Sequence, residues 1–332
     1  MNVLVTGGAG FVGSVLIKHL LNENFNVKCL DKFFFGDEYM NTLSKKNNLE
    51  LIHDDIRTFN GDILDNVDAV IDLAAISNDP AGELEPTKTY DVNHKGRVRV
   101  ANLCKKHGVK RYILSSSISV YGFQSEIVNE ESPVNPLTTY SKANRNAELE
   151  ILPLNDDNFC VTVLRFSSIY GKSPRMRFDL AVNNMALDLF RFKKLIISGD
   201  GSQSRPFLHI NDAASAFQMI LESSVNDVSG EIFNVGSDEQ NYSINRLSED
   251  VGEAINIDYE KEFQGTLDHR SYTISFKKIR ELGFNPKYTV NDGSKEIFQA
   301  LVNEEIVPSK KMWTLKWYKH LIETDNFSKK SK

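Results

Sequence analysis

Two hydroxyl-bearing side chains have the types and spacing needed to move a proton at a substrate oxygen. Ser117 ends a run of three serines after a short apolar segment, and Tyr140 begins a helical pattern further along. A serine hydroxyl and a phenol that meet over one substrate oxygen can both hydrogen-bond it while the phenol transfers the proton. A phenol has an ordinary pKa of about 10. To act as a base at neutral pH it therefore needs a cation nearby.

A glycine pattern at the start of the chain indicates what this pair would work beside. Gly7, Gly10 and Gly13 follow the apolar residues 3–6 and precede a helical pattern over residues 14–21. In a dinucleotide-binding turn, such glycines permit the strand-to-helix turn, the approach of backbone to a pyrophosphate, and close helix packing. The N–H groups that open the helix, those of Phe11, Val12 and Gly13, would then face the phosphates.

Asp31 predicts which dinucleotide is bound. It ends the next expected strand, residues 26–30, about 20 residues beyond the turn. A carboxylate there accepts hydrogen bonds from the adenosine ribose hydroxyls and repels a 2′-phosphate. Lys32 follows directly and would weaken that repulsion, so NADP stays open. We expect NAD as the cofactor.

Short β-like runs alternate with helical stretches over the first half of the chain. Such alternation requires right-handed crossovers and a parallel sheet with helices on both faces. The expected fold class is α/β, a doubly wound parallel Rossmann sheet with a smaller, mixed α/β substrate domain. Further strands are expected over residues 49–52, 68–73, 111–114 and 159–164, and helices over residues 86–107 and 139–152.

The regular alternation ends near residue 167. Helices are expected over residues 178–192, 212–223, 244–255 and 291–303, mixed with short strands at 195–197 and 231–234. We expect residues 1–166 to form an NAD-binding domain. Residues 167–325 would mainly form a substrate domain over the carboxyl edge of the sheet, with some segments returning to the first domain. Residues 326–332 would be a tail. Trp313, Trp317 and Tyr318 predict a final helix that packs on the body.

The composition excludes several other classes of protein. The chain has 332 residues and a net charge of −6, which argues against binding to nucleic acid or to an anionic membrane surface. No apolar run approaches the ~20 residues of a membrane span, and the first strand leaves no room for a signal peptide. Cys29, Cys104 and Cys160 are expected to be reduced core thiols, and no ligand spacing indicates a metal site. We therefore expect a cytoplasmic protein.

Together these motifs resemble the extended short-chain dehydrogenase/reductases that act on nucleotide-linked sugars. That family contains UDP-glucose 4-epimerase and dTDP-glucose 4,6-dehydratase, and the resemblance runs from Met1 to about Pro286. It implies that the glycine turn holds the pyrophosphate, that Asp31 holds the ribose, and that Ser117 and Tyr140 are the catalytic pair. It further implies cofactor contacts for Asp55, Ile56, Leu73, Ala74, Ala75, Asn93, Ser115, Tyr140 and Asn144.

The resemblance also implies a set of substrate contacts. Arg205 lies in a stretch similar to the one whose arginine grips the sugar-nucleotide diphosphate, and Arg270 resembles a second such arginine. A planar guanidinium suits paired phosphate oxygens. His209 and Asp212 are expected to be structural, as a buried histidine and a helix N-cap that hold the Arg205 loop.

Residues 173–184 would open the first helix of the substrate domain. Arg175 and Arg177 could reach a sugar or a phosphate there, although two exposed arginines at a helix start are equally ordinary. Asn183 is a further candidate substrate contact. This stretch is similar, more weakly, to C4 dehydrogenases and epimerases of surface-polysaccharide pathways. The family's members form homodimers through helices that match residues 86–107 and 139–152, so a homodimer is implied.

One position departs from the family's pattern. Its Tyr-x-x-x-Lys motif would require a lysine at position 144, where this chain has Asn144. Lys142 lies about 200° around the helix from Tyr140. A cation ~4 Å away at an effective dielectric of ~20 is worth about 4 kcal/mol, or about three pKa units. We expect Asn144 to hydrogen-bond the nicotinamide ribose, and Tyr140 to have an unusually high pKa with slow or alkaline-shifted oxidation.

A second departure narrows the reaction. Ile118 and Ser119 stand where the family's 4,6-dehydratases carry acids, and neither can do acid–base work, so dehydration is not expected. The leading hypothesis is an NAD-dependent epimerase that transfers a hydride at C4 of a nucleotide-linked sugar through a keto-sugar. The alternatives are a C4 dehydrogenase or 4-ketoreductase with net cofactor turnover, and a non-catalytic NAD-binding subunit or sensor.

Overall fold

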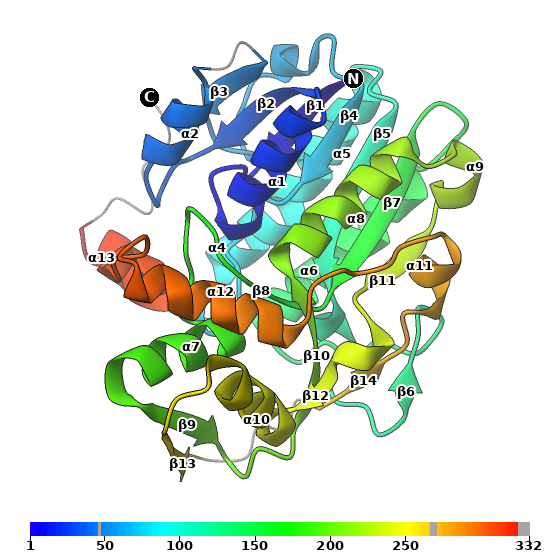
Figure 1. Cartoon of the computed structure of the whole chain (residues 1–332). Helices are drawn as coiled ribbons and strands as arrows, with labels where there is room; N and C mark the ends of the chain where they lie inside the picture. The colour runs from blue at the N-terminus through cyan, green and yellow to red at the C-terminus, as the bar shows by residue number, and fades with distance from the viewer. Residues whose placement is uncertain (46–47, 266–270, 325–332) are drawn as a thin grey trace.

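The computed structural model describes residues 1–45, 48–265 and 271–324 (Figure 1). Its centre is a seven-stranded parallel sheet in the order β11-β7-β5-β4-β1-β2-β3. This order reverses between β1 and β4, and ligands of doubly wound folds bind at such a reversal. The strands are β1 (Asn2–Thr6), β2 (Asn26–Asp31), β3 (Leu49–His53), β4 (Ala69–Asp72), β5 (Arg111–Ser117), β7 (Cys160–Phe166) and β11 (Ile232–Val235).

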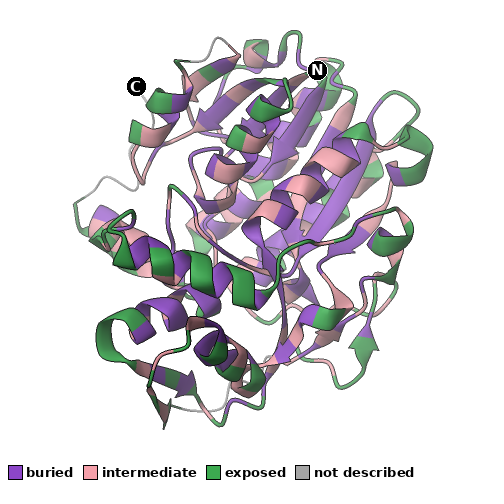
Figure 2. Ribbon diagram, viewed as in Figure 1, coloured by how far each residue is buried: buried purple, intermediate pink, exposed green. Residues whose placement is uncertain are grey.

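Helices cover both faces of this sheet, and their apolar sides make two separate cores. On one face α1 (Phe11–Asn22) and α8 (Ile210–Glu222) pack Leu16 and Phe217 into the first core. On the other face α5 (Arg97–Lys106) and α6 (Thr139–Ile151) pack Val100 and Ala147 into the second. Strands buried on both sides read as continuous apolar runs, and Figure 2 shows the central strands buried almost throughout. The expected doubly wound α/β fold is confirmed.

The helix expected over residues 86–107 is one continuous rod with a change of winding in its middle. It begins as α4 (Pro86–Tyr90), widens into a π-helical segment over Asp91–Gly96, and continues as α5. The π segment places the buried Asn93 toward the loop after β4, where its amide bonds both backbone groups of Ile76. π segments inside α-helices often occur near functional sites.

Whereas α2 (Glu38–Leu43) and α9 (Val225–Val228) lie in the upper part of Figure 1, near β3 and β7, most of the remaining chain lies beyond the carboxyl ends of the sheet strands, in its lower part. Small two- and three-stranded sheets there support the helices. The strands are β6 (Ile127–Val128), β8 (Ser168–Tyr170), β9 (Lys194–Ser198), β10 (Ser204–His209), β12 (Asn241–Ser243), β13 (Glu260–Gln264) and β14 (Thr273–Ile274). The remaining helices are α2 (Glu38–Leu43), α3 (Asp79–Gly82), α7 (Ala181–Phe192), α9 (Val225–Val228), α10 (Ile244–Ile255), α11 (Lys277–Glu281), α12 (Val290–Val302) and α13 (Thr314–Glu323).

Two sequence expectations differ from this structure. The helix expected from residue 178 begins at Ala181, because Leu180, its N-cap residue, has extended backbone and the residues before it form a loop. The strands β6, β8, β10, β12, β13 and β14 were not expected, since most of them are short and each pairs with a distant segment. The three cysteines are free and buried, as expected. Among the described residues, no helix combines the length and apolar character needed to cross a membrane.

Candidate active site

The glycine turn between β1 and α1 has the close backbone packing that only glycine allows. Gly7 has a φ of +67°, and a Cβ there would lie 2.8 Å from Ala74 Cα. A Cβ on Gly13 would lie 2.5 Å from the Gly7 carbonyl oxygen. Gly10 is the N-cap of α1 and offers no side chain to the first N–H groups of the helix. Those N–H groups and their positive end of the helix dipole are available to an anion.

Asp31 lies at the end of β2, beside this turn. Its carboxylate accepts hydrogen bonds from the backbone N–H of Ala9 at 3.0 Å and of Phe33 at 2.7 Å. Burial raises the pKa of Asp31, while these two N–H donors act to lower it. The two bonds leave each carboxylate oxygen a second lone pair that can accept a hydroxyl.

The turn opens onto a cavity that most of the expected cofactor contacts line together. Segments from β1, α1, β2, the loop after β3 and the loop after β4 meet there, as the strand reversal requires. The expected residues on its wall are Gly7, Gly10, Phe11, Val12, Gly13, Asp31, Asp55, Ile56, Leu73, Ala74 and Ala75.

Arg175, proposed from the sequence as a substrate contact, lies on the wall of this same cavity. Its guanidinium stacks 3.6 Å from the centre of the Phe35 ring, and Nη2 donates to Thr314 Oγ1 at 3.0 Å. Nε and Nη1 are buried and, among the described residues, have no hydrogen-bond partner. Burial lowers the pKa of this guanidinium. A buried cation with unused donors is costly unless an anion completes it.

A second cavity contains the expected catalytic pair. Ser115 and Ser117, at the end of β5, and Tyr140, at the start of α6, all line it. Thr138 caps α6 with a capping box, since its hydroxyl accepts from the Ser141 N–H while Ser141 Oγ accepts from the Thr138 N–H. This cap fixes the first turn of α6 and with it the position of the phenol.

Asn144 lies behind Tyr140 and lines neither cavity, because its side chain is only 1% exposed. Its Nδ2 donates to the Tyr140 carbonyl oxygen at 3.1 Å, and its Oδ1 accepts from Arg97 Nη1 at 2.8 Å. The structure therefore places Asn144 as a support of Tyr140 and away from the position expected for a ribose contact. Burial raises the pKa of Tyr140, the direction expected from the sequence.

Cationic side chains lie around the second cavity. Arg177 makes a bidentate ion pair with Asp179, at 3.1 and 2.8 Å, and faces both cavities. Arg205, on β10, lines the second cavity with its guanidinium 5.2 Å from the centre of the Tyr272 ring. Arg270, the second expected phosphate ligand, lies outside the described residues.

Besides Asn144, two further expected residues lie away from the walls of these two cavities. Asn93 holds the backbone of Ile76, as described above. Asn183 is fully buried, where its amide accepts from the Gly171 N–H and donates to the carbonyls of Gly171 and Arg177. Its neighbour Asn184 lines a further cavity next to Arg205.

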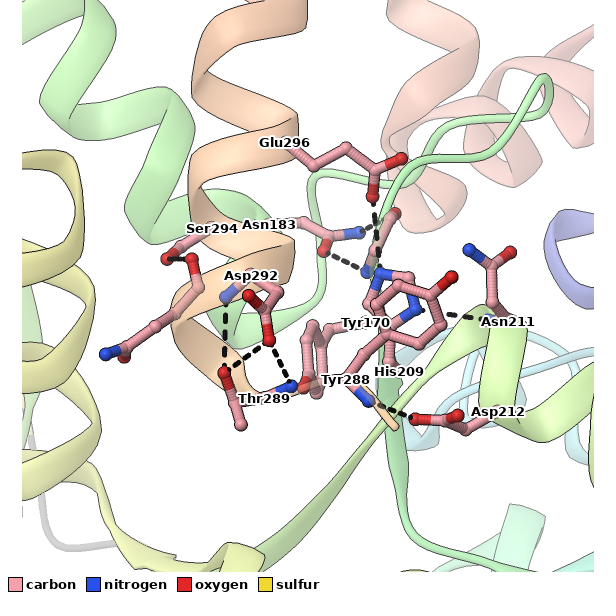
Figure 3. Close-up of polar contacts among 12 residues, drawn as sticks. Tyr170, Asn183, His209, Asn211, Asp212, Tyr288, Thr289, Asp292, Ser294 and Glu296 are labelled. Carbon is pink, nitrogen blue, oxygen red and sulfur yellow. Dashed lines mark hydrogen bonds and ion pairs between the residues drawn. The ribbon is translucent and has the colours of Figure 1, made fainter. Parts of the chain in front are cut away.

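His209 is buried, as expected, but the N-cap of α8 is His209 and not Asp212 (Figure 3). His209 is the N-cap of α8 and accepts from the Asn211 N–H, while its ring stacks on Tyr288 at 4.5 Å. Asp212 is not the N-cap. Its carboxylate accepts from the N–H groups of Lys287 and Tyr288 at 2.9 and 3.0 Å. This carboxylate thereby fastens the segment before α12 to α8, and so holds the strand that carries Arg205.

Asp212→Ala is expected to lower the free energy of unfolding by roughly 2–3 kcal/mol, because two N–H groups lose a charged acceptor. Denaturant unfolding of the variant and of Asp227→Ala, an exposed aspartate, measures the difference. Equal midpoints for the two variants would contradict this role of Asp212.

Several residues on the wall of the first cavity were not predicted from the sequence. Phe34 and Phe35 come from the loop after β2, Arg57 from the loop after β3, and Tyr318 from α13. Arg57 pairs with Asp55 at 2.7 Å, and this pair holds the Asp55 pKa well below its usual range. The Phe-Phe pair could have been noticed as an apolar run beside Asp31. Tyr318 could not, since it lies nearly 300 residues away.

Comparison with known proteins agrees with this geometry. Residues 3–236 match the NAD dependent epimerase/dehydratase family. The chain belongs to this family. A protein of Methanocaldococcus jannaschii, provisionally named UDP-glucose 4-epimerase, is 30% identical over 316 residues, covering 91% of this chain and 98% of the relative.

Two further members of the family show the range of its reactions. UDP-glucuronic acid decarboxylase 1 of Arabidopsis thaliana is 29% identical, over 88% of this chain and 68% of the relative. The crystal structure of UDP-glucuronic acid 4-epimerase from Bacillus cereus, in complex with UDP-glucuronic acid and NAD, has a TM-score of 0.82. It is 25% identical and covers 92% of this chain and 100% of that one.

Proposed function

We propose that this chain is an NAD-dependent oxidoreductase/epimerase that acts at C4 of a nucleotide-linked sugar through a keto-sugar intermediate. The observation that carries the proposal is that the two cavities meet. Phe11, Val12, Leu73, Ala75 and Arg177 line both of them, so the glycine turn and the Ser117–Tyr140 pair face one continuous space. A cofactor bound along the first cavity would end beside the hydroxyls of the second.

The residues of the first cavity fit a dinucleotide. The glycine turn and the start of α1 would hold the pyrophosphate, and the unused Nε and Nη1 of Arg175 would donate to it. Asp31 would hold the adenosine ribose. We propose the corresponding division of the chain, in which residues 1–166 bind the cofactor and residues 167–325 mainly bind the substrate.

A bound nicotinamide would supply the hydride acceptor for oxidation at a ring carbon of the sugar and the hydride donor for the reverse reduction. Tyr140, as the phenolate, would take the proton of the sugar C4 hydroxyl as the C4–H bond breaks, which leaves a C4 ketone. Ser117 would hydrogen-bond the same oxygen and orient it. In the return step Tyr140 would give the proton back, and the opposite face of C4 can receive the hydride once the sugar ring has turned over.

The second cavity supports a diphosphate-linked substrate without a dehydration step. Arg205, and Arg270 by the resemblance, would hold the diphosphate. Ser119 Oγ is buried without a hydrogen-bond partner among the described residues and lies on the cavity wall, where a sugar hydroxyl would complete it. Neither Ile118 nor Ser119 carries the acid that a 4,6-elimination needs.

Asp31 is expected to make the protein prefer NAD over NADP. Asp31→Ser should reduce the ratio of the two binding constants by roughly 10- to 100-fold, because a like charge beside a 2′-phosphate is worth a few kcal/mol. Calorimetric titration of wild type and variant with both cofactors measures this ratio. An unchanged ratio would show that Asp31 does not face the adenosine ribose.

Product analysis tests the proposed reaction. The protein is incubated with NAD⁺ and a panel of UDP- and dTDP-sugars, with and without a keto acceptor, and products are separated by chromatography. An epimerase gives the C4 epimer with no lasting NADH absorbance. Lasting absorbance instead indicates the C4 dehydrogenase or ketoreductase alternative. Bound cofactor without any sugar product would overturn the proposal and favour the non-catalytic subunit or sensor.

The proposal also covers the cellular location, the oligomeric state and the biological role of the enzyme. We propose a cytoplasmic homodimer that contacts through α5 and α6, in agreement with the exposed Leu149 on α6, and a role in surface-polysaccharide biosynthesis. Light scattering at several concentrations tests the dimer.

A further inference from the structure

Arg97 is a buried cation that contacts Asn144, one helical turn along α6 from the proposed catalytic tyrosine. Its side chain is 1% exposed and extends from α5 toward the ends of β4 and β5. Nη2 donates to the carbonyl oxygens of Asp72 at 2.8 Å and Ser115 at 2.6 Å, and Nη1 donates to Asn144 Oδ1 at 2.8 Å. Three hydrogen bonds thus fix the plane of the guanidinium against α6.

This contact determines which way the Asn144 amide faces. A guanidinium has only donors, so the amide must turn its oxygen toward Arg97. Its NH₂ group then points toward Tyr140, where it donates to the backbone carbonyl oxygen at 3.1 Å. A hydrogen bond from the same side chain also acts to lower the pKa of the Tyr140 phenol. The amide dipole therefore lies with its positive end on the side of the tyrosine and its negative end on the cation.

We propose that Arg97, acting through Asn144, supplies Tyr140 with the positive charge that a lysine at position 144 would otherwise provide. Arg97 is then a positioning residue for proton transfer, contributed by a different helix from the one that carries the tyrosine. The inference rests on the proposed function, because Tyr140 is the proton-transfer group only if the sugar reacts in the second cavity. With a cation supplied from α5, the missing lysine at position 144 does not favour the non-catalytic alternative.

Other charged groups around these residues act on the Tyr140 pKa in both directions. Asp72, on β4, lies 3.6 Å from Arg97 Nε, a different nitrogen from the one facing Asn144. Its oxygens also accept the hydroxyls of Thr6 and Tyr112. Around the phenol, Arg97, Asn144 and Arg177 act to lower the Tyr140 pKa, whereas burial and Asp79 on α3 raise it. Arg97 gives the largest of the lowering contributions.

Arg97 could instead serve only to tie the ends of β4 and β5 together through Asp72 and Ser115. A purely structural arginine would change the melting temperature when replaced, but it would not change the ionisation of Tyr140. The protonation state of the phenol is therefore the quantity to measure.

The test is a pH titration of Tyr140 in protein labelled with ¹³C at tyrosine Cζ, with Tyr140→Phe used to assign the resonance. In Arg97→Gln the Tyr140 pKa should rise by about one pH unit or more, since an opposite charge close by typically shifts a pKa by about 1–3 pH units. In the phenolate-dependent oxidation, the rising limb of the pH–rate profile should move to higher pH by the same amount. An unchanged Tyr140 pKa would overturn the inference.

Two further variants make the result specific. Arg97→Thr combined with Asn144→Lys moves the cation onto α6, and it should return the Tyr140 pKa toward the wild-type value. This double variant also remains informative if Arg97→Gln does not fold. Arg99→Gln is the matched control, because Arg99 lies on the same helix but bonds the carbonyls of Ile56 and Phe59. It should leave the Tyr140 pKa unchanged.

The titration needs no sugar, so it separates this inference from the proposed function. If the Tyr140 pKa changes in Arg97→Gln while the wild type converts no nucleotide sugar, the proposed function fails and the inference about Arg97 stands. If the wild type converts sugars but the Tyr140 pKa is the same in Arg97→Gln, only the inference about Arg97 fails. If the Tyr140 pKa in the double variant remains as high as in Arg97→Gln, the cation does not act through position 144, and the inference is overturned.

Discussion

Replacing Tyr140 by phenylalanine is expected to lower kcat about 1,000-fold, because positioned acid–base groups contribute roughly 10²- to 10⁴-fold. Phenylalanine retains the ring that packs at the start of α6 and removes only the hydroxyl. Cofactor affinity should stay within a small factor of wild type, since Tyr140 lines the second cavity and the glycine turn lines the first. Single-turnover absorbance at saturating sugar measures the rate, and calorimetry measures cofactor binding.

Tyr288→Phe is the matched control for this experiment. Tyr288 is 39% exposed, and its ring stacks on His209 well away from the catalytic pair. Loss of its hydroxyl should leave kcat unchanged. If Tyr140→Phe kept more than a tenth of the wild-type kcat, another group would have to transfer the proton.

Arg175→Met is expected to weaken NAD binding by roughly 10- to 150-fold, the equivalent of one charged hydrogen-bond contact of about 1.5–3 kcal/mol. Without cofactor, however, the variant should melt at the same temperature as wild type or higher. The reason is that Arg175 is buried with two nitrogens unpaired among the described residues, and methionine removes that cost. The rise in melting temperature caused by added NAD should shrink accordingly.

The combination of weaker binding and undiminished stability distinguishes a ligand contact from a structural one. Arg191→Met is a suitable control, because Arg191 is an exposed arginine on α7 whose guanidinium lies 5.7 Å from the Trp313 ring. NAD affinity should not respond to it. If Arg175→Met bound NAD normally, or if it melted well below wild type, Arg175 would be a structural residue and not a cofactor contact.

The parts of the site that could be predicted from the sequence are local. The glycine turn, Asp31 and the loop after β4 each depend on a few neighbouring residues, and the parallel order of strands brings them together at one edge. The two cavities confirm that Gly7, Asp31 and Ala74 share one wall and that Ser117 and Tyr140 share another.

The parts that escaped prediction depend on contacts between distant segments. Arg97 and Asn144 are 47 residues apart, and nothing in either local pattern shows that α5 and α6 bring them together. Arg175 was assigned to the substrate because its neighbours open the substrate domain, yet its loop turns back toward α1. The wrong assignment of the N-cap to Asp212 has the same origin, since the partner of Asp212 is the chain near Lys287.

The last described helix, α13, bears on how long a bound coenzyme stays. Its Tyr318 forms part of the wall beside Arg175, and the Trp317 indole N–H donates to the Phe34 carbonyl oxygen at 2.6 Å. If a coenzyme left through this wall, that bond would break and the contact between the Phe35 and Tyr318 rings would separate. Long residence suits a catalyst that regenerates its own hydride acceptor in every cycle. Slow release would limit the turnover of an enzyme that must exchange its coenzyme after each reaction.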